Sequence, residues 1–315
     1  MNIKKLIAGL GLLLFASTAQ SQNINNPNKN GPLGTQVNTL SGNVFIPRTD
    51  VYIPGRGFDL DITFYYNSYF FNQEMGFGKG WSFKYAIKYI NDTVPGRKII
   101  FWGDGREDNY DSLPGGNYQM PKGFFSKLVQ YQPGKFRLTE TDSTTYFFDN
   151  AMHKKITRVQ EPNGNFINFN YTDSLLTSIV NTAGQTISFT YNTGKLATVV
   201  DAVAPLSRTY LYSYDAGGNL IEVTDPLGGK FKYTYLINGP MKTLADKNNN
   251  KIDIIYFPDF SARELIGCNK RISFSYDTGY NKTVVTDHFD NGEANQVTTY
   301  SYQKLGDLSW LSAMS

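Results

Sequence analysis

The sequence predicts an all-β protein, built as an antiparallel β-hairpin repeat array that follows an N-terminal β-domain. Tyrosine returns every 20–24 residues through the second half of the chain, at Tyr171, Tyr191, Tyr214, Tyr235, Tyr256, Tyr276 and Tyr300. Aromatic residues make up 15% of the 315 residues, and 29 glycines accompany them, as in proteins with many short strands and turns. A fixed period of this size indicates stacked repeats, in which each unit covers the apolar face of its neighbour.

Residues 1–21 have the features of a signal peptide. Two lysines precede an apolar run of ten residues, which is too short to span a membrane. Small residues place the cleavage site before Gln22, with cleavage after Ala19 as the alternative. We therefore expect an exported protein that is secreted, held at the cell surface or left in the periplasm, with no membrane span in the mature chain. Residues 22–35 are rich in Asn, Pro and Gly and are expected to form a disordered leader.

Residues 36–150 alternate apolar and polar side chains without a fixed repeat, which predicts an N-terminal β-domain. Strands are expected at 59–66 and 81–89, because side chains of one kind recur there at every second position. Asp104-Gly105 follows an apolar run and predicts a hairpin turn. Residues 136–148 hold two alternating runs around a short polar turn, which predicts a second hairpin.

Residues 151–305 are expected to form the hairpin array, and residues 306–315 a bare tail. Four strands of the array align directly and end in Phe/Tyr-x-Tyr, which places two aromatic rings on one face: 166–171, 186–191, 230–235 and 271–276. The turns between units are expected to use Gly164, Gly184, Gly217 and Gly228. We expect the rings of successive units to stack into a ladder, each aromatic pair adding about 0.5–1.5 kcal/mol beyond burial.

The clearest copy of the repeat is Tyr-Asp-Ala-Gly-Gly-Asn-Leu-Ile-Glu-Val-Thr-Asp-Pro-Leu-Gly, at residues 214–228. The residues expected to carry the repeat are structural rather than catalytic: Tyr171, Tyr191, Tyr214, Asp215, Gly218, Leu220, Asp225, Gly228, Tyr235, Tyr256 and Tyr276. The segment 214–228 resembles the YDxxGxL…vTDPxG repeat of the Rhs/YD-repeat proteins.

The earlier part of the chain, residues 36–150, resembles the Rhs-associated domain found at the start of many Rhs proteins. The resemblance is carried by Ser41-Gly42-Asn43, Ile53-Pro54-Gly55-Arg56-Gly57, Tyr66-Asn67-Ser68 and Gly76-Phe77-Gly78-Lys79-Gly80-Trp81-Ser82. One departure is Phe64, where the family often has Arg. The two motif sets occur in the order that the family shows.

The resemblance implies an opening segment of a shell. In Rhs proteins, dozens of β-hairpin units coil into a hollow cocoon around a C-terminal toxin or another passenger. This chain has about seven units and lacks the Arg-Tyr-Asp-Pro motif with which such shells usually end. We therefore expect a truncated shell segment for toxin delivery, without its passenger. Its open strand edges are expected to pair with a downstream shell or passenger polypeptide, or with another copy of the chain.

Catalytic and metal-binding patterns are weak, and no enzyme activity, catalytic residue, cofactor or metal site is expected. His153 and His288 are far apart and have no neighbouring Cys or His. Asp246 begins a segment like an EF-hand loop, but Lys251 and Phe257 stand where that loop needs Gly and Glu, so a turn is expected.

Two carboxylate pairs share strand faces: Asp59 with Asp61, and Glu140 with Asp142. Such pairs can serve glycoside hydrolysis, although carboxylates on solvated strand faces are far commoner.

The alternative function is that of a cell-surface carbohydrate-binding or adhesion protein. Flat β-surfaces bind sugars through aromatic rings, and Trp81 and Trp102 are available for binding a cell-surface glycan. Nucleic acid is not an expected partner, because the net charge is only +3 and no basic stripe is visible. The single cysteine, Cys268, excludes an intrachain disulfide; it is expected to be a small buried side chain, or alternatively an intermolecular thiol in a turn.

Overall fold

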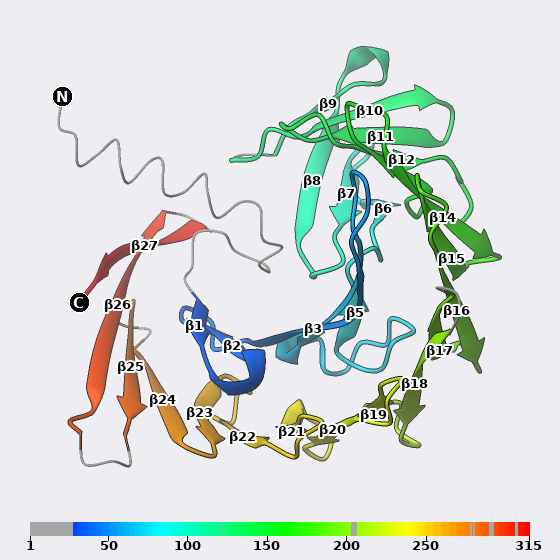
Figure 1. The fold of residues 1–315 in the computed structure, drawn as a ribbon. Helices are drawn as coiled ribbons and strands as arrows, with labels where there is room; N and C mark the ends of the chain where they lie inside the picture. The colour runs from blue at the N-terminus through cyan, green and yellow to red at the C-terminus, as the bar shows by residue number, and fades with distance from the viewer. Residues whose placement is uncertain are drawn as a thin grey trace.

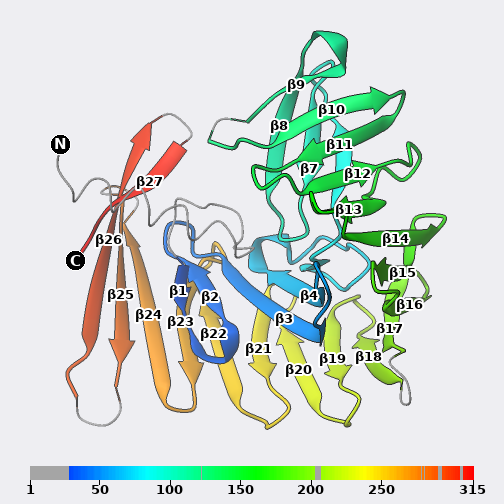
Figure 2. The same ribbon diagram turned by 45° about the horizontal axis from the view of Figure 1, so that its top comes forward.

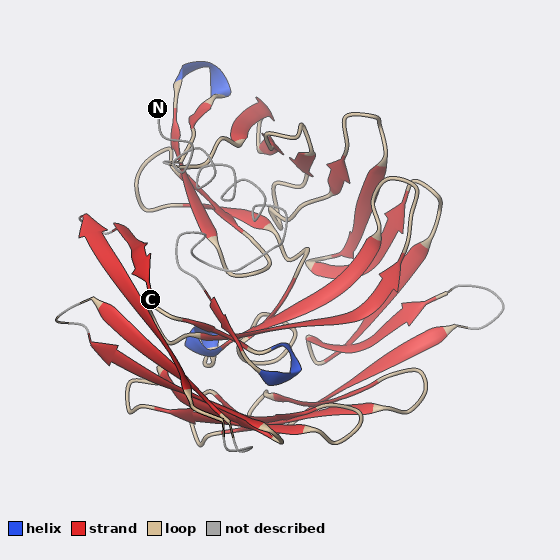
Figure 3. Cartoon of the chain, turned by 60° about the vertical axis from the view of Figure 1, so that its left-hand side comes forward, coloured by secondary structure: helices blue, strands red, loops and turns tan. Residues whose placement is uncertain are grey.

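Strands make up nearly the whole fold, as the sequence predicts. The computed structural model describes residues 28–121, 123–202, 207–277, 279, 281–289, 293–305 and 308–315. Within these residues, the helical elements are single 3-10 turns, coloured blue in Figure 3: η2 (Pro32–Gly34), η3 (Ser68–Phe70) and η4 (Pro114–Gly116). None of the described helices is long and apolar enough to cross a membrane. The expected signal peptide, 1–21, lies outside the described residues.

The first sheet has five antiparallel strands in chain order: β1 (Asn28–Asn30), β2 (Gln36–Asn38), β3 (Val44–Ile53), β4 (Leu60–Asn67) and β5 (Trp81–Phe83). The expected disordered leader is wrong for residues 28–35, since β1 pairs with β2 there. The expected strand at 59–66 is confirmed by β4. We refer to β1–β5 as the N-terminal sheet.

The expected single strand at 81–89 is wrong, because the chain changes sheet within it. After β5, the Ala86 amide donates to the carbonyl of Phe83 (2.7 Å) and turns the backbone. The chain then enters a four-stranded sheet formed by β6 (Lys88–Asn91), β7 (Lys98–Phe101), β8 (Glu107–Ser112) and β9 (Tyr118–Gln119). The turn expected at Asp104-Gly105 joins β7 to β8, as predicted.

In the part of the chain that the structure describes, one sheet of eighteen strands holds the repeats. Its strands follow chain order, side by side (Figure 2). They are β10 (Lys127–Gln132), β11 (Lys135–Thr139), β12 (Thr145–Phe148), β13 (Arg158–Gln160), β14 (Phe166–Thr172), β15 (Leu175–Asn181), β16 (Thr186–Asn192), β17 (Lys195–Asp201), β18 (Arg208–Tyr214), β19 (Leu220–Thr224), β20 (Lys230–Tyr235), β21 (Met241–Ala245), β22 (Lys251–Tyr256), β23 (Ala262–Gly267), β24 (Lys270–Asp277), β25 (Lys282–His288), β26 (Gln296–Leu305) and β27 (Leu308–Met314). We call this the repeat sheet.

The repeat sheet extends beyond the expected array at both ends. It begins at Lys127 rather than near residue 151, since the predicted hairpin at 136–148 (β11 and β12) already belongs to it. It also continues through the expected tail, where β27 pairs antiparallel with β26. Alternation and pairing continue across both expected boundaries, so the backbone forms one sheet.

The four-stranded sheet closes the beginning of the repeat sheet. Its last strand, β9, meets β10 through a bridge between Asn117 and Val129, and its first strand, β6, meets the segment before β13 through a bridge between Lys88 and Lys155. Tyr89, Ile100, Tyr110, Leu128, Leu138 and Phe148 belong to the buried core here. These contacts cover the edge of β10, which would otherwise expose unpaired backbone groups.

The repeat sheet bends in an arc, and the N-terminal sheet lies on its concave side (Figure 1). Every second side chain of the repeat strands points to that side, so Ile187 and Phe189 on β16 are buried, while the alternating Ser188 and Thr190 are not. Buried side chains of the two sheets belong to one hydrophobic cluster. The repeats therefore obtain much of their cover from the beginning of the same chain.

Candidate docking face between the N-terminal sheet and the repeat sheet

The repeat tyrosines lie on the concave side, each at a β-bulge or hairpin end. A register shift directly precedes Tyr171, Tyr191, Tyr214, Tyr235 and Tyr256. After each shift the tyrosine pairs with the first buried residue of the returning strand: Leu176, Leu196, Leu220, Met241 and Ala262, respectively. Each bulge bends its strand and leaves one residue out of the ladder of backbone hydrogen bonds.

The expected stack of tyrosine rings is wrong, because the units are linked by hydroxyl groups instead. Each hydroxyl donates to a carbonyl in the preceding unit: Tyr171 to Ile156 (2.9 Å), Tyr214 to Leu196 (2.9 Å), Tyr235 to Leu220 (2.7 Å), Tyr256 to Met241 (2.9 Å) and Tyr276 to Ala262 (2.9 Å). Tyr191 differs, because its hydroxyl oxygen accepts a hydrogen bond from the backbone of Leu176, which opposes the larger effect of burial on its pKa. Successive tyrosines are two strands apart, about 9.5 Å, which exceeds the range of about 4.5–7 Å for ring pairs.

The amides freed near these bulges are satisfied by the first part of the chain. Four of them donate to an oxygen in residues 42–87: Ile156 to Ile87 O (3.0 Å), Leu196 to Gly76 O (2.9 Å), Met241 to Tyr66 Oη (2.6 Å) and Ala262 to Gly42 O (2.9 Å). A buried amide without a partner would destabilise the fold, so these contacts couple the repeats to the N-terminal part of the chain. The carbonyl groups of the same four residues accept the tyrosine hydroxyl bonds, so each residue links two repeat units to the N-terminal part of the chain.

A buried ion pair lies at the centre of the docking face. Arg48 and Asp50 of β3 form two hydrogen bonds, from Nε to Oδ1 (2.7 Å) and from Nη2 to Oδ2 (3.0 Å). The repeat sheet completes the cluster, since Arg48 Nη1 donates to the Tyr233 hydroxyl (2.9 Å) and the Tyr212 hydroxyl donates to Asp50 Oδ2 (2.5 Å). Burial, and then the charge of Asp50, raises the pKa of Tyr212. We call these four residues the Arg48 cluster.

Aromatic rings surround the Arg48 guanidinium. Its central carbon lies 4.8 Å from the ring centroid of Trp81 and 5.4 Å from that of Phe64. The Trp81 indole donates to the Tyr235 hydroxyl (3.0 Å). This bond connects the aromatic cage around Arg48 to the hydrogen-bonded series of repeat tyrosines, which we call the tyrosine ladder. Trp81 is fully buried, so it fills the core and cannot offer the sugar platform of the alternative function. Trp102 is partly covered and donates to Asp108 Oδ2 (2.6 Å).

The acidic and glycine residues of the repeat form its turns. The Asp215 carboxylate accepts from the Asn219 amide (2.8 Å), and the Asp225 carboxylate accepts from the Gly229 amide (2.7 Å). Gly218 and Gly228 take φ values of 87° and 84°, which favour glycine. Leu220 is buried behind the first of these turns. Gly217, expected as a turn glycine, is not among the positive-φ residues, so Gly218 fills that role.

The segment at Asp246 is a turn of the same type, as predicted. Its carboxylate accepts from the amides of Asn248 (2.9 Å) and Asn250 (2.8 Å). No group of three or more metal-ligating side chains is present in the ranges that the structure describes.

The remaining candidate residues are distributed over several places. Asp59 accepts from the Tyr52 hydroxyl (2.5 Å), whereas Asp61 pairs with Lys84 (2.7 Å). Burial, the largest influence, raises the pKa of Glu140. The carboxylate of Asp142 accepts from the Thr144 amide (2.8 Å) within the hairpin turn.

The two histidines lie apart, and the cysteine is on the surface. His153 packs against the Tyr171 ring, and its Nδ1 accepts from the Lys155 amide (3.1 Å). His288 Nε2 lies 2.8 Å from Ser273 Oγ across β24 and β25. Cys268 is exposed in the turn before β24, so the expectation of a buried side chain is wrong, and an intermolecular thiol stays a prediction.

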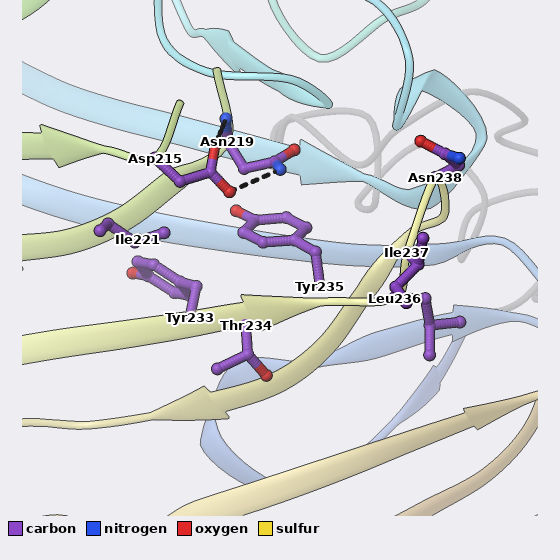
Figure 4. A pocket seen from close by; sticks show the side chains of 9 residues that line it. All are labelled: Asp215, Asn219, Ile221, Tyr233, Thr234, Tyr235, Leu236, Ile237 and Asn238. Atoms are coloured by element: carbon purple, nitrogen blue, oxygen red, sulfur yellow. Dashed lines mark hydrogen bonds between the residues drawn. The ribbon is translucent and has the colours of Figure 1, made fainter. Parts of the chain in front are cut away.

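A shallow pocket opens between the turns after β18 and β20. Figure 4 shows its lining, with Asp215 bonded to Asn219 at one end and Ile237 and Asn238 at the other. Ile237 is 96% exposed, whereas Tyr233, on the other side of the pocket, is buried (Figure 4). The carboxylate that lines the pocket, that of Asp215, is already hydrogen bonded within the turn. The pocket therefore offers no pair of free acid and base groups among its lining residues.

Alkaline pH is expected to unfold the protein as the hydroxyl groups of the repeat tyrosines ionise. Burial raises the pKa of all six repeat tyrosines from Tyr171 to Tyr276, and that of Tyr302 to about 12. Because the unfolded value is about 10, the neutral hydroxyls stabilise the fold fully below that pH, and this stability is lost as pH rises above it. Circular dichroism and tyrosinate absorbance should change together above pH about 10. Ionisation of most tyrosines near pH 10 with the strand signal intact would contradict the assignment.

Two family models match the chain. Residues 34–110 match "Domain of unknown function (DUF6531)", and residues 202–230 match "RHS Repeat". Similar curated proteins include tRNA nuclease WapA of Bacillus subtilis (strain 168) and tRNA3(Ser)-specific nuclease WapA of Bacillus spizizenii, both 28% identical over 138 residues, or 44% of this chain. The chain spans about 6% of the length of these curated relatives.

Solved structures of low similarity also match. One is the Photorhabdus luminescens Tc holotoxin pore, with 12% identity, a TM-score of 0.42, and coverage of 88% of this chain and 15% of that one. Another is the crystal structure of TcdB2-TccC3, with 14% identity, a TM-score of 0.32, and coverage of 96% and 21%. The family models, in the order that the sequence predicts, confirm that this chain resembles the Rhs/YD-repeat proteins in its first β-domain and in its repeats.

Proposed function

We propose that this protein is an exported structural scaffold, the opening wall segment of an Rhs-type shell that encloses or delivers a C-terminal passenger. The observation that carries the proposal is the single curved sheet from β10 to β27, whose concave side holds the N-terminal sheet (Figure 1). Buried polar side chains, among them the Arg48 cluster, hold the repeat sheet and the N-terminal sheet together. In the docking face, that is, the contact surface between the N-terminal sheet and the repeat sheet, hydrogen bonds and an ion pair fix the positions of the strands. These interactions suit a structural wall.

The two ends of the repeat sheet differ, and this gives the proposed wall a direction. The edge of β10 is bridged by β9, whereas β27 is the last strand in the order of the described sheet. Thr299 and Ser315 exchange both backbone hydrogen bonds (2.7 and 3.0 Å), so the amide of the preceding Met314 points away from β26. Met314 is also 64% exposed. We infer that β27 accepts a further strand, from a downstream shell polypeptide or from a second copy.

Met314→Pro should block this pairing. Proline removes the outward amide without breaking a bond to β26, and it is tolerated on edge strands. We expect the unaltered mature protein to associate as its concentration rises, and Met314→Pro to remain a monomer in light scattering coupled to size exclusion. Met314→Ala, which keeps the amide, should behave like the unaltered protein. A monomer at every concentration without any substitution would argue against an open wall edge.

Export rests on the features of residues 1–21. When the chain is expressed with its own leader, we expect the protein outside the cytoplasm to begin at Gln22, as determined by intact mass. Retention of the uncleaved leader in the cytoplasm would remove the exported location from the proposal and leave the wall role to be tested by Met314→Pro.

A further inference from the structure

Strand β3 crosses the repeat sheet and touches one hairpin after another. Proceeding along β3 and its flanks, the partners run backwards through the repeats: Gly42 with Ala262, Arg48 with Tyr233, Asp50 with Tyr212, Gly55 with Asn181, and Gly57 with Asn165. Figure 2 shows β3 lying across the neighbouring repeat strands β19 to β22. One extended segment therefore contacts the repeats from β23 back to the turn before β14.

The length of this segment matches the width that it crosses. From Gly42 to Gly57, fifteen steps of extended chain reach at most about 50 Å, at about 3.3 Å per residue. From the turn before β14 to the start of β23 there are nine inter-strand steps, or about 43 Å at about 4.8 Å each. Even at full extension, the segment would therefore exceed the width of these strands by only about 7 Å.

Both ends of the segment are seated without room for side chains. A Cβ on Gly42 would lie 2.5 Å from the Cβ of Ser261, and one on Gly57 would lie 2.5 Å from the Cβ of Asn165. Their φ values, 75° and 86°, also favour glycine. The backbone of the segment therefore lies directly against the repeats at both ends.

The middle of the segment is held by the Arg48 cluster. A register shift in the pairing of β3 with β4 falls between Thr49 and Val51. It changes which positions face the core, so Ile46 and Arg48 are buried before it, Asp50 within it, and Val51 and Ile53 after it. Without the shift, one half of β3 would turn its side chains away from the repeats.

We propose that β3, with Gly42 and Gly55–Gly57, is a transverse strut that sets the span and curvature of the first repeats. In a repeat array, each hairpin contacts only the hairpins next to it, so small deviations in the angle between units accumulate along the array. A strand fastened at both ends and at its centre removes that freedom. This role goes beyond a wall function, since it assigns the curvature to one named strand.

Lengthening the strut tests the proposal in the full mature chain. In a Cys268→Ser background, Asn170→Cys and Arg263→Cys place spin labels on exposed positions near the two ends of the span. Inserting Thr-Val after Val51 keeps the alternation of side chains and adds about 6–7 Å of strand. We expect the distance between the labels, measured by double electron–electron resonance, to lengthen by up to about 6 Å. The same insertion after Gly123, where a side chain would meet nothing within 4 Å, should leave the distance unchanged.

A folded insertion variant with an unchanged distance would overturn the proposal. Should the insertion variant fail to fold, Arg48→Met with Asp50→Leu releases the centre of the strut while keeping apolar cover. That pair should broaden the label distance distribution at least twofold. A distribution of unaltered width in this pair would equally overturn the proposal, while the edge pairing at Met314 would be unaffected by either result.

Discussion

Replacing Arg48 by alanine is expected to lower the free energy of unfolding by about 3–5 kcal/mol, the range for breaking a buried ion pair. The loss arises because Asp50 would stay buried with only the Tyr212 hydroxyl as a side-chain partner, and Tyr233 would lose its donor. The aromatic cage of Trp81 and Phe64 would also surround an empty space. Urea denaturation of the mature protein measures the effect.

Two further variants make this result specific to the buried pair. Arg48→Met combined with Asp50→Leu should regain most of the stability, because no unpaired charge is left in the core. Lys251→Ala, which breaks the exposed pair with Asp253 (2.8 Å), should leave the urea midpoint where it is. If Arg48→Ala shifted the midpoint no more than Lys251→Ala does, the Arg48 cluster could not be the centre of the docking face.

Replacing Tyr235 by alanine is expected to cost about 3–5 kcal/mol, the range for truncating a large aromatic side chain in a core. Tyr235 packs against the hydrophobic cluster, donates to Leu220 O (2.7 Å) and accepts from the Trp81 indole (3.0 Å). It therefore serves both the ladder and the docking face. Thermal and urea unfolding of the full mature chain give the value.

Tyr235→Phe separates the hydroxyl from the ring. This change removes only the oxygen and leaves two buried groups without their partner, so we expect a loss of about 1–3 kcal/mol. Tyr52→Phe is the matched control, because its hydroxyl bonds to Asp59 on an exposed face and its loss should not move the unfolding midpoint. Equal effects of Tyr235→Phe and Tyr52→Phe would show that the ladder hydroxyls do not link the units.

Local patterns were sufficient to predict some of the strands and turns. The alternation at 59–66 corresponds to β4, and the repeat turns at Asp215 and Asp225 close on themselves through Asx hydrogen bonds. Such features depend on residues that are close together in the sequence, so the sequence alone is enough to predict them. The period of the tyrosines also placed them correctly in successive hairpins.

Contacts distant in sequence could not be predicted. The period does not reveal that two strands separate successive tyrosines, so it predicts ring stacking where the structure has hydroxyl links. The alternation at 81–89 continues across a change of sheet, and nothing local marks the turn at Ala86. The partners of Arg48 lie 164 to 185 residues away, at Tyr212 and Tyr233, so their convergence depends on the folding of the whole chain.

An engineered disulfide between positions 42 and 261 tests most directly whether the repeats curve around the N-terminal sheet. A Cβ on Gly42 would lie 2.5 Å from the Cβ of Ser261, about 1 Å closer than in a relaxed disulfide, so the two backbones must move apart by about that distance and the variant should lose some stability. In a Cys268→Ser background, Gly42→Cys with Ser261→Cys should cross-link nearly completely within each molecule on mild oxidation. Gly228→Cys with Ser261→Cys is the control that should remain reduced. A mature, folded protein in which the 42–261 pair stays reduced would contradict the docking of the two sheets.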